Sequence, residues 1–133
     1  MSLWGLILPI RKVLCQYVNY RPVKVLPSVV PSARNCRQSD IGWIFIRENS
    51  EGEYAGQGGV THEGQPNAIA TDVSIYTAQG LERIMRFAFD AAASRPRKIL
   101  TMLTQSDAQR HGMVSWDGIF KLVRSIPVSR QTR

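Results

Sequence analysis

The spacing of apolar and polar residues predicts a chain in which strands alternate with helices. The clearest pattern lies between Thr77 and Pro96, where apolar residues recur at steps of three and four, as they do on one face of a helix. Thr77 is a favourable helix cap, and Pro96 ends the pattern. The apolar face of this predicted helix consists of Leu81, Ile84, Met85, Ala88, Phe89 and Ala92.

Two further amphipathic patterns predict helices near the two ends of the chain. The first begins after Ser2, which can cap it, and is expected to end at Arg21-Pro22. The last helix is predicted over 111–123. The apolar positions are Leu3, Leu6, Ile7, Ile10, Leu14 and Tyr17 in the first helix, and Val114, Ile119, Leu122 and Val123 in the last.

Short apolar runs between the helices predict strands, of which 42–47 and 98–104 are expected to be buried. Residues 28–40 are rich in Ser, Pro and Arg and predict a loop, whereas 55–68, with four glycines, predicts a loop or a hairpin arm. Strands that alternate with helices indicate an α/β fold. The predicted strands are Val23 to Leu26, Gly42 to Arg47, Ala70 to Tyr76 and Lys98 to Thr104.

Composition and charge narrow the classes of function. The 133 residues are 44% hydrophobic, which fits one globular domain. A net charge of +7 favours anionic partners. The arginines are spread out and do not interleave with aromatic residues, so nucleic acid is not the expected partner. No apolar run approaches the length of a membrane span, so a membrane is not expected either. Cys15 and Cys36 lack metal or redox spacing and favour a cytoplasmic protein.

Three arginines and a tyrosine are the candidate chemistry. The planar guanidinium fork matches a carboxylate, so Arg11, Arg21 and Arg47 could together hold a small dicarboxylate. The alternative is solvated surface charge. Tyr54 could act as a general acid in an electropositive pocket, or it is an ordinary half-buried tyrosine. No metal ligands are predicted, because Glu48, Glu51, Glu53 and Glu63 lack a ligand spacing and are expected to form a solvated face.

Longer motifs carry a family resemblance. Residues 47–56, RENSEGEYAG, resemble the signature of the β-decarboxylating hydroxyacid dehydrogenases, which include the isocitrate and isopropylmalate dehydrogenases. Residues 3–27 look like the family's substrate helix and its following strand. Residues 70–98 and 106–117 are most similar to the tartrate dehydrogenase and D-malate dehydrogenase (decarboxylating) branch. The resemblance implies a partial isocitrate/isopropylmalate dehydrogenase-like fold.

The same resemblance implies an activity and a role for each matching residue. The family oxidises a 2-hydroxy dicarboxylate with NAD and then decarboxylates it, with Mg²⁺ or Mn²⁺ polarising the oxygen. Arg11, Arg21 and Arg47 match its carboxylate-binding arginines, and Tyr54 matches the tyrosine that protonates the enol carbon. The family forms dimers with shared active sites, so a homodimer or heterodimer is expected.

Some positions depart from the family. Gln105 stands at the position of a lysine that takes part in proton transfer, and glutamine cannot act as a base. Asp107 replaces an asparagine near the nicotinamide. The family's metal-binding aspartates and adenosine loop have no match here, so 1–123 is expected to be a central segment, with 124–133 an unmatched basic tail.

Three functional expectations follow. The first is a fragment of a tartrate/D-malate-type oxidoreductase that is inactive alone. The alternative is a non-catalytic partner that pairs with a full-length dehydrogenase. A third, supported only by charge, is a non-catalytic anion-binding module.

Overall fold

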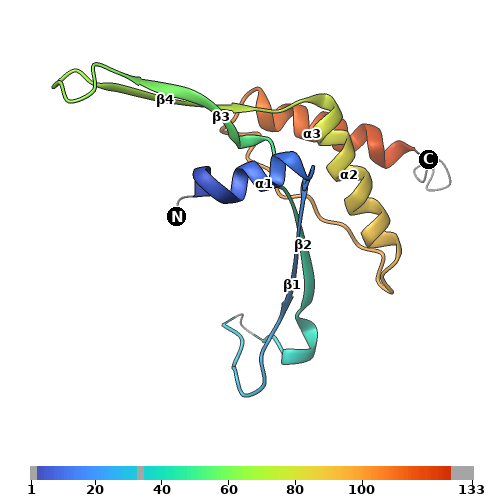
Figure 1. The fold of residues 1–133 in the computed structure, drawn as a ribbon. Coiled ribbons are helices and arrows are strands. Elements are labelled where there is room, and N and C mark those ends of the chain that lie inside the picture. Colours follow the sequence, from blue (N-terminus) through green and yellow to red (C-terminus); the bar gives the residue numbers. More distant parts are fainter. Residues whose placement is uncertain (1–2, 33–34, 127–133) are drawn as a thin grey trace.

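The computed structural model describes residues 3–32 and 35–126 and combines two antiparallel ribbons with packed helices (Figure 1). Within these ranges no helix has the length and apolar character needed to cross a bilayer. The residues of the predicted tail from 127 onward lie outside the described part of the chain. The elements are η1 (Leu3–Ile7, a π-helical turn), α1 (Leu8–Val13), β1 (Val18–Lys24), η2 (Gln38–Asp40, a 3₁₀ turn), β2 (Gly42–Glu48), β3 (Gly52–Thr61), β4 (Ile69–Ile75), α2 (Ala78–Ala93) and α3 (Gly112–Ser125).

Each ribbon consists of two antiparallel strands. β1 pairs with β2 from Val18 opposite Glu48 onward, and β3 pairs with β4 from Gly52 opposite Ile75 onward. The β3–β4 ribbon projects away from the helices (Figure 1). The segment 55–68, for which a loop or a hairpin arm was equally compatible with the sequence, is therefore a hairpin arm.

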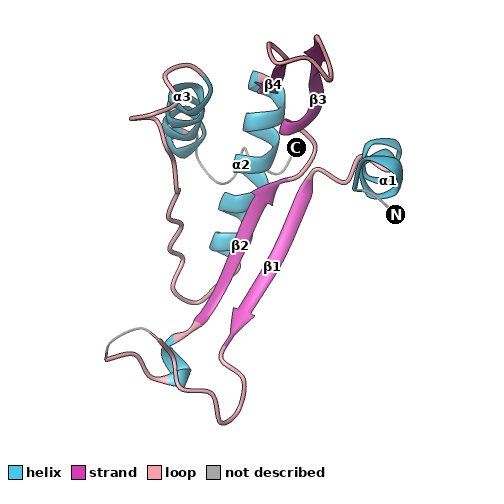
Figure 2. Ribbon diagram, turned by 90° about the vertical axis from the view of Figure 1, so that its left-hand side faces the viewer, coloured by secondary structure: helices cyan, strands magenta, loops and turns pink. Residues whose placement is uncertain are grey.

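The core lies between α2 and α3. Leu81, Ile84 and Met85 of α2 pack with Val123 of α3, and each is at most 3% exposed, which confirms the predicted apolar face of the central helix. The Thr77 hydroxyl accepts a hydrogen bond from the Gly80 amide at 3.0 Å, so the predicted cap is confirmed too. Figure 2 shows α2 between α3 and the β1–β2 ribbon. Half-buried side chains surround this core: Tyr17, Val18, Ile46, Tyr76, Phe89, Met102, Trp116, Ile119 and Phe120.

Tyr76 joins the base of the β3–β4 ribbon to α3. Its ring packs edge-on against Trp116, with centroids 6.3 Å apart. Two glycines leave room for it, because a Cβ on Gly52 would lie 3.0 Å from the Tyr76 ring and one on Gly112 would lie 2.8 Å from it. Burial and the nearby Glu53 carboxylate raise the pKa of the Tyr76 phenol above its usual value.

The first helix and the strand after it differ from the prediction. The helix ends at Val13 instead of continuing to Arg21, because Cys15 adopts a left-handed conformation with φ of 50° that a helix cannot continue through. β1 therefore begins at Val18. Pro22 lies inside this strand, which is tolerated because, in the described part of the chain, β1 pairs with β2 on one edge alone.

Two expectations about buried strands were wrong. Residues 98–104 form no strand; among the described residues they have no ladder partner, and Ile99 and Leu103 are 63% and 78% exposed. β2 forms as predicted but is not buried on both faces, since Trp43 and Phe45 are 49% and 44% exposed. Only the face with Ile46 packs against the core.

Candidate functional site

The end of β2 sends successive side chains to opposite faces of the ribbon. Alternation along the strand places Arg47 on one face and Glu48 on the other. Arg47 lies opposite Asn19 of β1, and Glu48 faces Arg83 of α2. The motif 47–56 therefore presents Arg47 to the exposed face of the ribbon and Glu48 to the core.

Arg47, Arg11 and Tyr54 are brought together. Arg47 Nη2 donates a hydrogen bond to Tyr54 Oη at 2.7 Å, and the Arg47 guanidinium carbon lies 4.9 Å from the centre of the Tyr54 ring. The Arg11 guanidinium carbon lies 5.9 Å from the same ring, within the range of a cation–π contact. Two of the three predicted arginines thus converge on the predicted tyrosine.

Arg21 occupies the same face of the β1–β2 ribbon. It lies two residues beyond Asn19, which is the cross-strand neighbour of Arg47, so all three side chains share one face. Arg21 Nε donates to Asn19 Oδ1 at 2.9 Å. Arg21 therefore lies on the same face as Arg47. We call Arg11, Arg21, Arg47 and Tyr54 together the arginine cluster.

A bulge in β3 turns Tyr54 toward the arginines. Gly52 pairs with Ile75, but the next pair is Gln57 with Val73, so four residues, 53–56, stand opposite a single one. Bulges of this kind redirect side chains next to functional sites. The bulge also touches the first helical segment, because Lys12 Nζ donates to the Ala55 carbonyl at 3.4 Å.

Gly56 allows that segment to approach closely. It has a φ of 74°, and a Cβ at this position would lie 3.0 Å from the Trp4 ring. The contact places α1, which carries Arg11, against the bulge, which carries Tyr54. Gly56 thus belongs to the architecture of the site.

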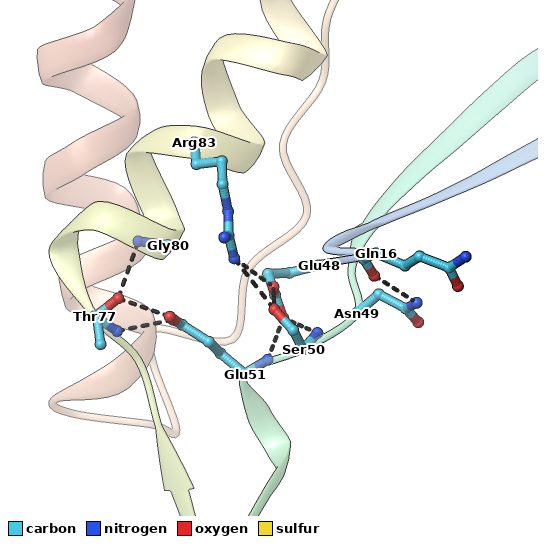
Figure 3. Close-up of polar contacts among 8 residues, drawn as sticks. All are labelled: Gln16, Glu48, Asn49, Ser50, Glu51, Thr77, Gly80 and Arg83. Carbon is cyan, nitrogen blue, oxygen red and sulfur yellow. Dashed lines mark hydrogen bonds and ion pairs between the residues drawn. The ribbon is translucent and has the colours of Figure 1, made fainter. Parts of the chain in front are cut away.

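Glu48 is a buried carboxylate at the core side of the motif (Figure 3). It is 7% exposed and accepts hydrogen bonds from the Ser50 amide (2.9 Å), the Glu51 amide (2.7 Å) and the Ser50 hydroxyl (2.6 Å). Arg83 Nη2 lies 3.7 Å from its Oε1. The expectation of a solvated acidic face is wrong for Glu48, because backbone donors of the following turn and a helix arginine take the place of water.

Glu51 fastens this turn to the start of α2. Its Oε2 accepts from the Thr77 amide at 2.9 Å and its Oε1 accepts from the Thr77 hydroxyl at 2.7 Å. Because the same hydroxyl also accepts from Gly80, the cap of α2 and the turn after β2 form one network (Figure 3). The acidic residues between Arg47 and Tyr54 therefore hold the scaffold from which those two side chains project.

Gln105 and Asp107 are the predicted site residues of the segment before α3. Both are exposed and belong to a turn in which the Ala108 and Gln109 amides donate to the Gln105 carbonyl at 3.0 and 2.8 Å. Across 3–32 and 35–126, no hydrogen bond or ion pair links either side chain to the cluster. Neither side chain therefore has a polar contact with the catalytic tyrosine candidate within the described residues.

The described residues do not fit a divalent metal. In 3–32 and 35–126, no group of three His, Cys, Asp or Glu side chains lies close enough to hold an ion. Glu48 and Glu51, the best-placed carboxylates, have both oxygens engaged by protein donors.

The arginine cluster is suited to binding an anion. None of its three guanidinium groups forms an ion pair within the described ranges, so their positive charge is not neutralised by the protein. Tyr54 accepts a hydrogen bond from Arg47, which leaves its own O–H free to donate. Carboxylates are the anions that arginine forks bind with paired hydrogen bonds.

Fold and site together define a chain of mixed helices and strands with an arginine-lined face, and the comparisons with known proteins assign its family. A family model described as Isocitrate/isopropylmalate dehydrogenase matches residues 3–126. The chain belongs to this family. Among solved structures, isocitrate dehydrogenase from Methylococcus capsulatus superposes with a TM-score of 0.73 and 26% identity, over 90% of this chain and 34% of that one. The expected partial fold is thereby confirmed.

Curated relatives narrow the branch. The chain is 56% identical over 119 residues to the probable tartrate dehydrogenase/decarboxylase TtuC' of Agrobacterium vitis, covering 90% of this chain and 33% of that protein. It is 42% identical over 117 residues to the D-malate dehydrogenase (decarboxylating) of Escherichia coli, covering 88% and 32%. The chain therefore spans about a third of the length of these relatives and lies in a family of decarboxylating hydroxyacid dehydrogenases.

Proposed function

We propose that this chain forms the carboxylate-binding segment of an NAD-dependent oxidoreductase that oxidises and decarboxylates a small 2-hydroxy dicarboxylate of the tartrate or D-malate type. The supporting observation is the convergence of Arg11 and Arg47 on Tyr54. Arg21 adds a third cation on the same face. The relatives named for tartrate and D-malate dehydrogenation support the choice of substrate class.

Each residue of the cluster receives a role in this proposal. The three arginines bind and orient the two carboxylates, because a fixed fork fits a carboxylate better than a single ammonium does. Tyr54 donates the proton to the carbon that loses carbon dioxide, through the O–H that Arg47 leaves free. NAD would supply hydride acceptance. Mg²⁺ or Mn²⁺, which the described residues do not hold, would supply polarisation of the hydroxyl oxygen. Asp107 is the only residue of the chain that we propose for the nicotinamide side.

The chain alone is proposed to be inactive. Gln105 occupies the position of the family's lysine, and its amide cannot take the proton of the substrate hydroxyl. Removing one member of a group of residues that act together costs several orders of magnitude in rate. NADH formation by the purified chain with D-malate, NAD and Mn²⁺ would contradict this part of the proposal.

A binding experiment tests the carboxylate site itself. Isothermal titration of the purified chain with D-malate and with tartrate should give binding that Arg47→Ala weakens by about tenfold or more, since a charge-assisted hydrogen bond contributes about 1.5–3 kcal/mol. Arg97→Ala is the matched control, because Arg97 is exposed in the turn after α2. Equal affinity of both variants and the parent chain would refute the proposed site.

A second candidate function is that of a non-catalytic partner for a full-length dehydrogenase. The observation that favours it is the β3–β4 arm, in which every residue from 56 to 75 is exposed. Its apolar residues include Val60, Ile69 and Val73, each more than half exposed, as in surfaces that other chains cover. The chain should then co-elute with a full-length tartrate dehydrogenase and change its kinetics, and Val73→Lys should prevent both. Separate elution of the two proteins would refute this candidate.

A further inference from the structure

We propose that Asn19 and Asn49 are positioning residues that hold the three arginines at fixed spacing for a dicarboxylate. This inference rests on the proposed carboxylate-binding function of the arginine cluster. Neither asparagine needs to touch the substrate. Their role is to connect the three chain segments from which the arginines project.

The connection is a continuous series of hydrogen bonds. Asn49 Nδ2 donates to the Gln16 carbonyl at 3.2 Å, and Asn49 Oδ1 accepts from Asn19 Nδ2 at 3.3 Å. Asn19 Oδ1 in turn accepts from Arg21 Nε at 2.9 Å. We call this series the asparagine relay.

The relay reaches all three elements that carry an arginine. Gln16 lies in the turn after α1, which bears Arg11. Asn19 lies in β1, which bears Arg21, and Asn49 directly follows β2, which ends just past Arg47. The ladder of β1 and β2 fixes the distance between those two strands, but no ladder holds α1, so the bond from Asn49 to the Gln16 carbonyl supplies that constraint.

Burial makes the relay specific. Asn49 is 4% exposed, so its amide cannot exchange these partners for water without cost. Its carbonyl and its amino group are both used within the protein. A buried amide with satisfied partners has one preferred orientation. Through its hydrogen bond to Asn49 the Asn19 amide is oriented as well, and Asn19 in turn orients Arg21.

The relay also determines which edge of Arg21 remains available. Because Nε donates to Asn19, the two terminal nitrogens form the free edge of the guanidinium. These nitrogens can bind a carboxylate end-on with two parallel hydrogen bonds. Holding a long side chain in this geometry before the ligand arrives removes part of the ordering cost of binding.

The first experiment measures the mobility of the Arg21 side chain in the absence of any ligand. We expect ¹⁵N relaxation of the Arg21 Nε–H group to show restricted motion in the parent chain and clearly greater motion in Asn49→Ala. The matched control is Ser50→Ala, which removes the hydroxyl bonds to Glu48 and Arg83 but leaves the relay intact. If the Arg21 Nε–H group is as restricted in Asn49→Ala as in the parent chain, the proposal is overturned.

The second experiment uses ligands that differ in carboxylate number. D-malate should bind to Asn49→Ala roughly threefold to tenfold more weakly than to the parent chain, the cost of one or two newly mobile side chains. D-lactate, which has one carboxylate, should bind equally to both. A merely structural role would weaken both ligands alike, and that result would also overturn the proposal.

A variant nearer to Arg21 guards against misfolding of Asn49→Ala. Asn19→Ala breaks the relay at a half-buried position and should reproduce the mobility of Arg21 and the selective loss of D-malate. Loss of D-malate binding in Arg47→Ala with no effect of either asparagine variant would overturn the relay while the carboxylate site stands. Absence of any arginine-dependent binding would instead refute the site, and the relaxation measurement would still decide on the relay.

Discussion

Replacing Glu48 by alanine tests whether the motif 47–56 depends on its buried carboxylate. The change removes the acceptor of three hydrogen bonds, from the Ser50 amide, the Glu51 amide and the Ser50 hydroxyl, at 2.9, 2.7 and 2.6 Å. It also leaves Arg83 without the carboxylate 3.7 Å away. Because Glu48 is 7% exposed, water cannot readily replace it.

The size of the effect follows from these contacts. A hydrogen bond to a charged group contributes about 1.5–3 kcal/mol, but contributions that share one acceptor do not add. Arg83 is 37% exposed, so its ion pair contributes little by itself. We expect Glu48→Ala to lower the free energy of unfolding by about 3 kcal/mol and Tm by roughly 10 °C for a chain of this size.

Thermal and urea unfolding, followed by circular dichroism, measure this loss. Glu63→Ala is the matched control, because Glu63 is exposed in the turn of the hairpin arm and should change stability by less than about 0.5 kcal/mol. Glu48→Gln keeps one acceptor oxygen and should fall between the two. A Glu48→Ala protein that melts within about 2 °C of the parent chain would refute the buried-carboxylate argument.

Two further changes probe the β3–β4 ribbon and its base. Gly58→Ala should separate the strands, because its Cβ would meet the Thr71 carbonyl oxygen, whereas a Cβ on the neighbouring Gly59 has open space. Cross-strand nuclear Overhauser effects should therefore vanish in Gly58→Ala and remain in Gly59→Ala. Their persistence in Gly58→Ala would contradict the geometry. Because the folded-state pKa of Tyr76 lies above its usual 10.0, the folded state resists losing this proton, so stability is full below pH 10.0 and declines as the pH rises past it. Urea midpoints one pH unit below and above that value should show a decline that Tyr76→Phe reduces, and an equal decline in both proteins would exclude this cause.

Local patterns predicted some elements well. The signals for α2 are all local: the cap at Thr77, the apolar face and the proline shortly after the helix, Pro96. Their spacing was sufficient to locate the helix. β1 was misplaced because the apolar pattern of the first helix continues through Tyr17, while the left-handed turn at Cys15 has no glycine to signal it. The strand predicted at 98–104 failed because strand formation requires a pairing partner, which composition cannot reveal.

The candidate site shows the same division. Side-chain chemistry made Arg11, Arg21, Arg47 and Tyr54 candidates but left surface charge as an alternative, and only the family resemblance favoured one site. The structure brings Arg11 and Arg47 to Tyr54. The burial of Glu48 was missed, because a run of charged residues normally indicates a solvated face. The signal that could have revealed it is the position of Glu48 at the end of a strand, directly before a turn whose free amides need an acceptor.

The bulge at 53–56 mechanically separates the hairpin arm from the site. Beyond it, the arm has both faces in water, so ladder hydrogen bonds alone hold it, and such a ribbon opens at little cost in free energy. The ladder is interrupted where four residues face one, and the contacts of Trp4 and Lys12 hold the bulge itself. Strand separation that begins with transient opening of the arm, or with a proteolytic cut at its tip, should therefore end at the bulge. The hydrogen bond between Arg47 and Tyr54 should remain.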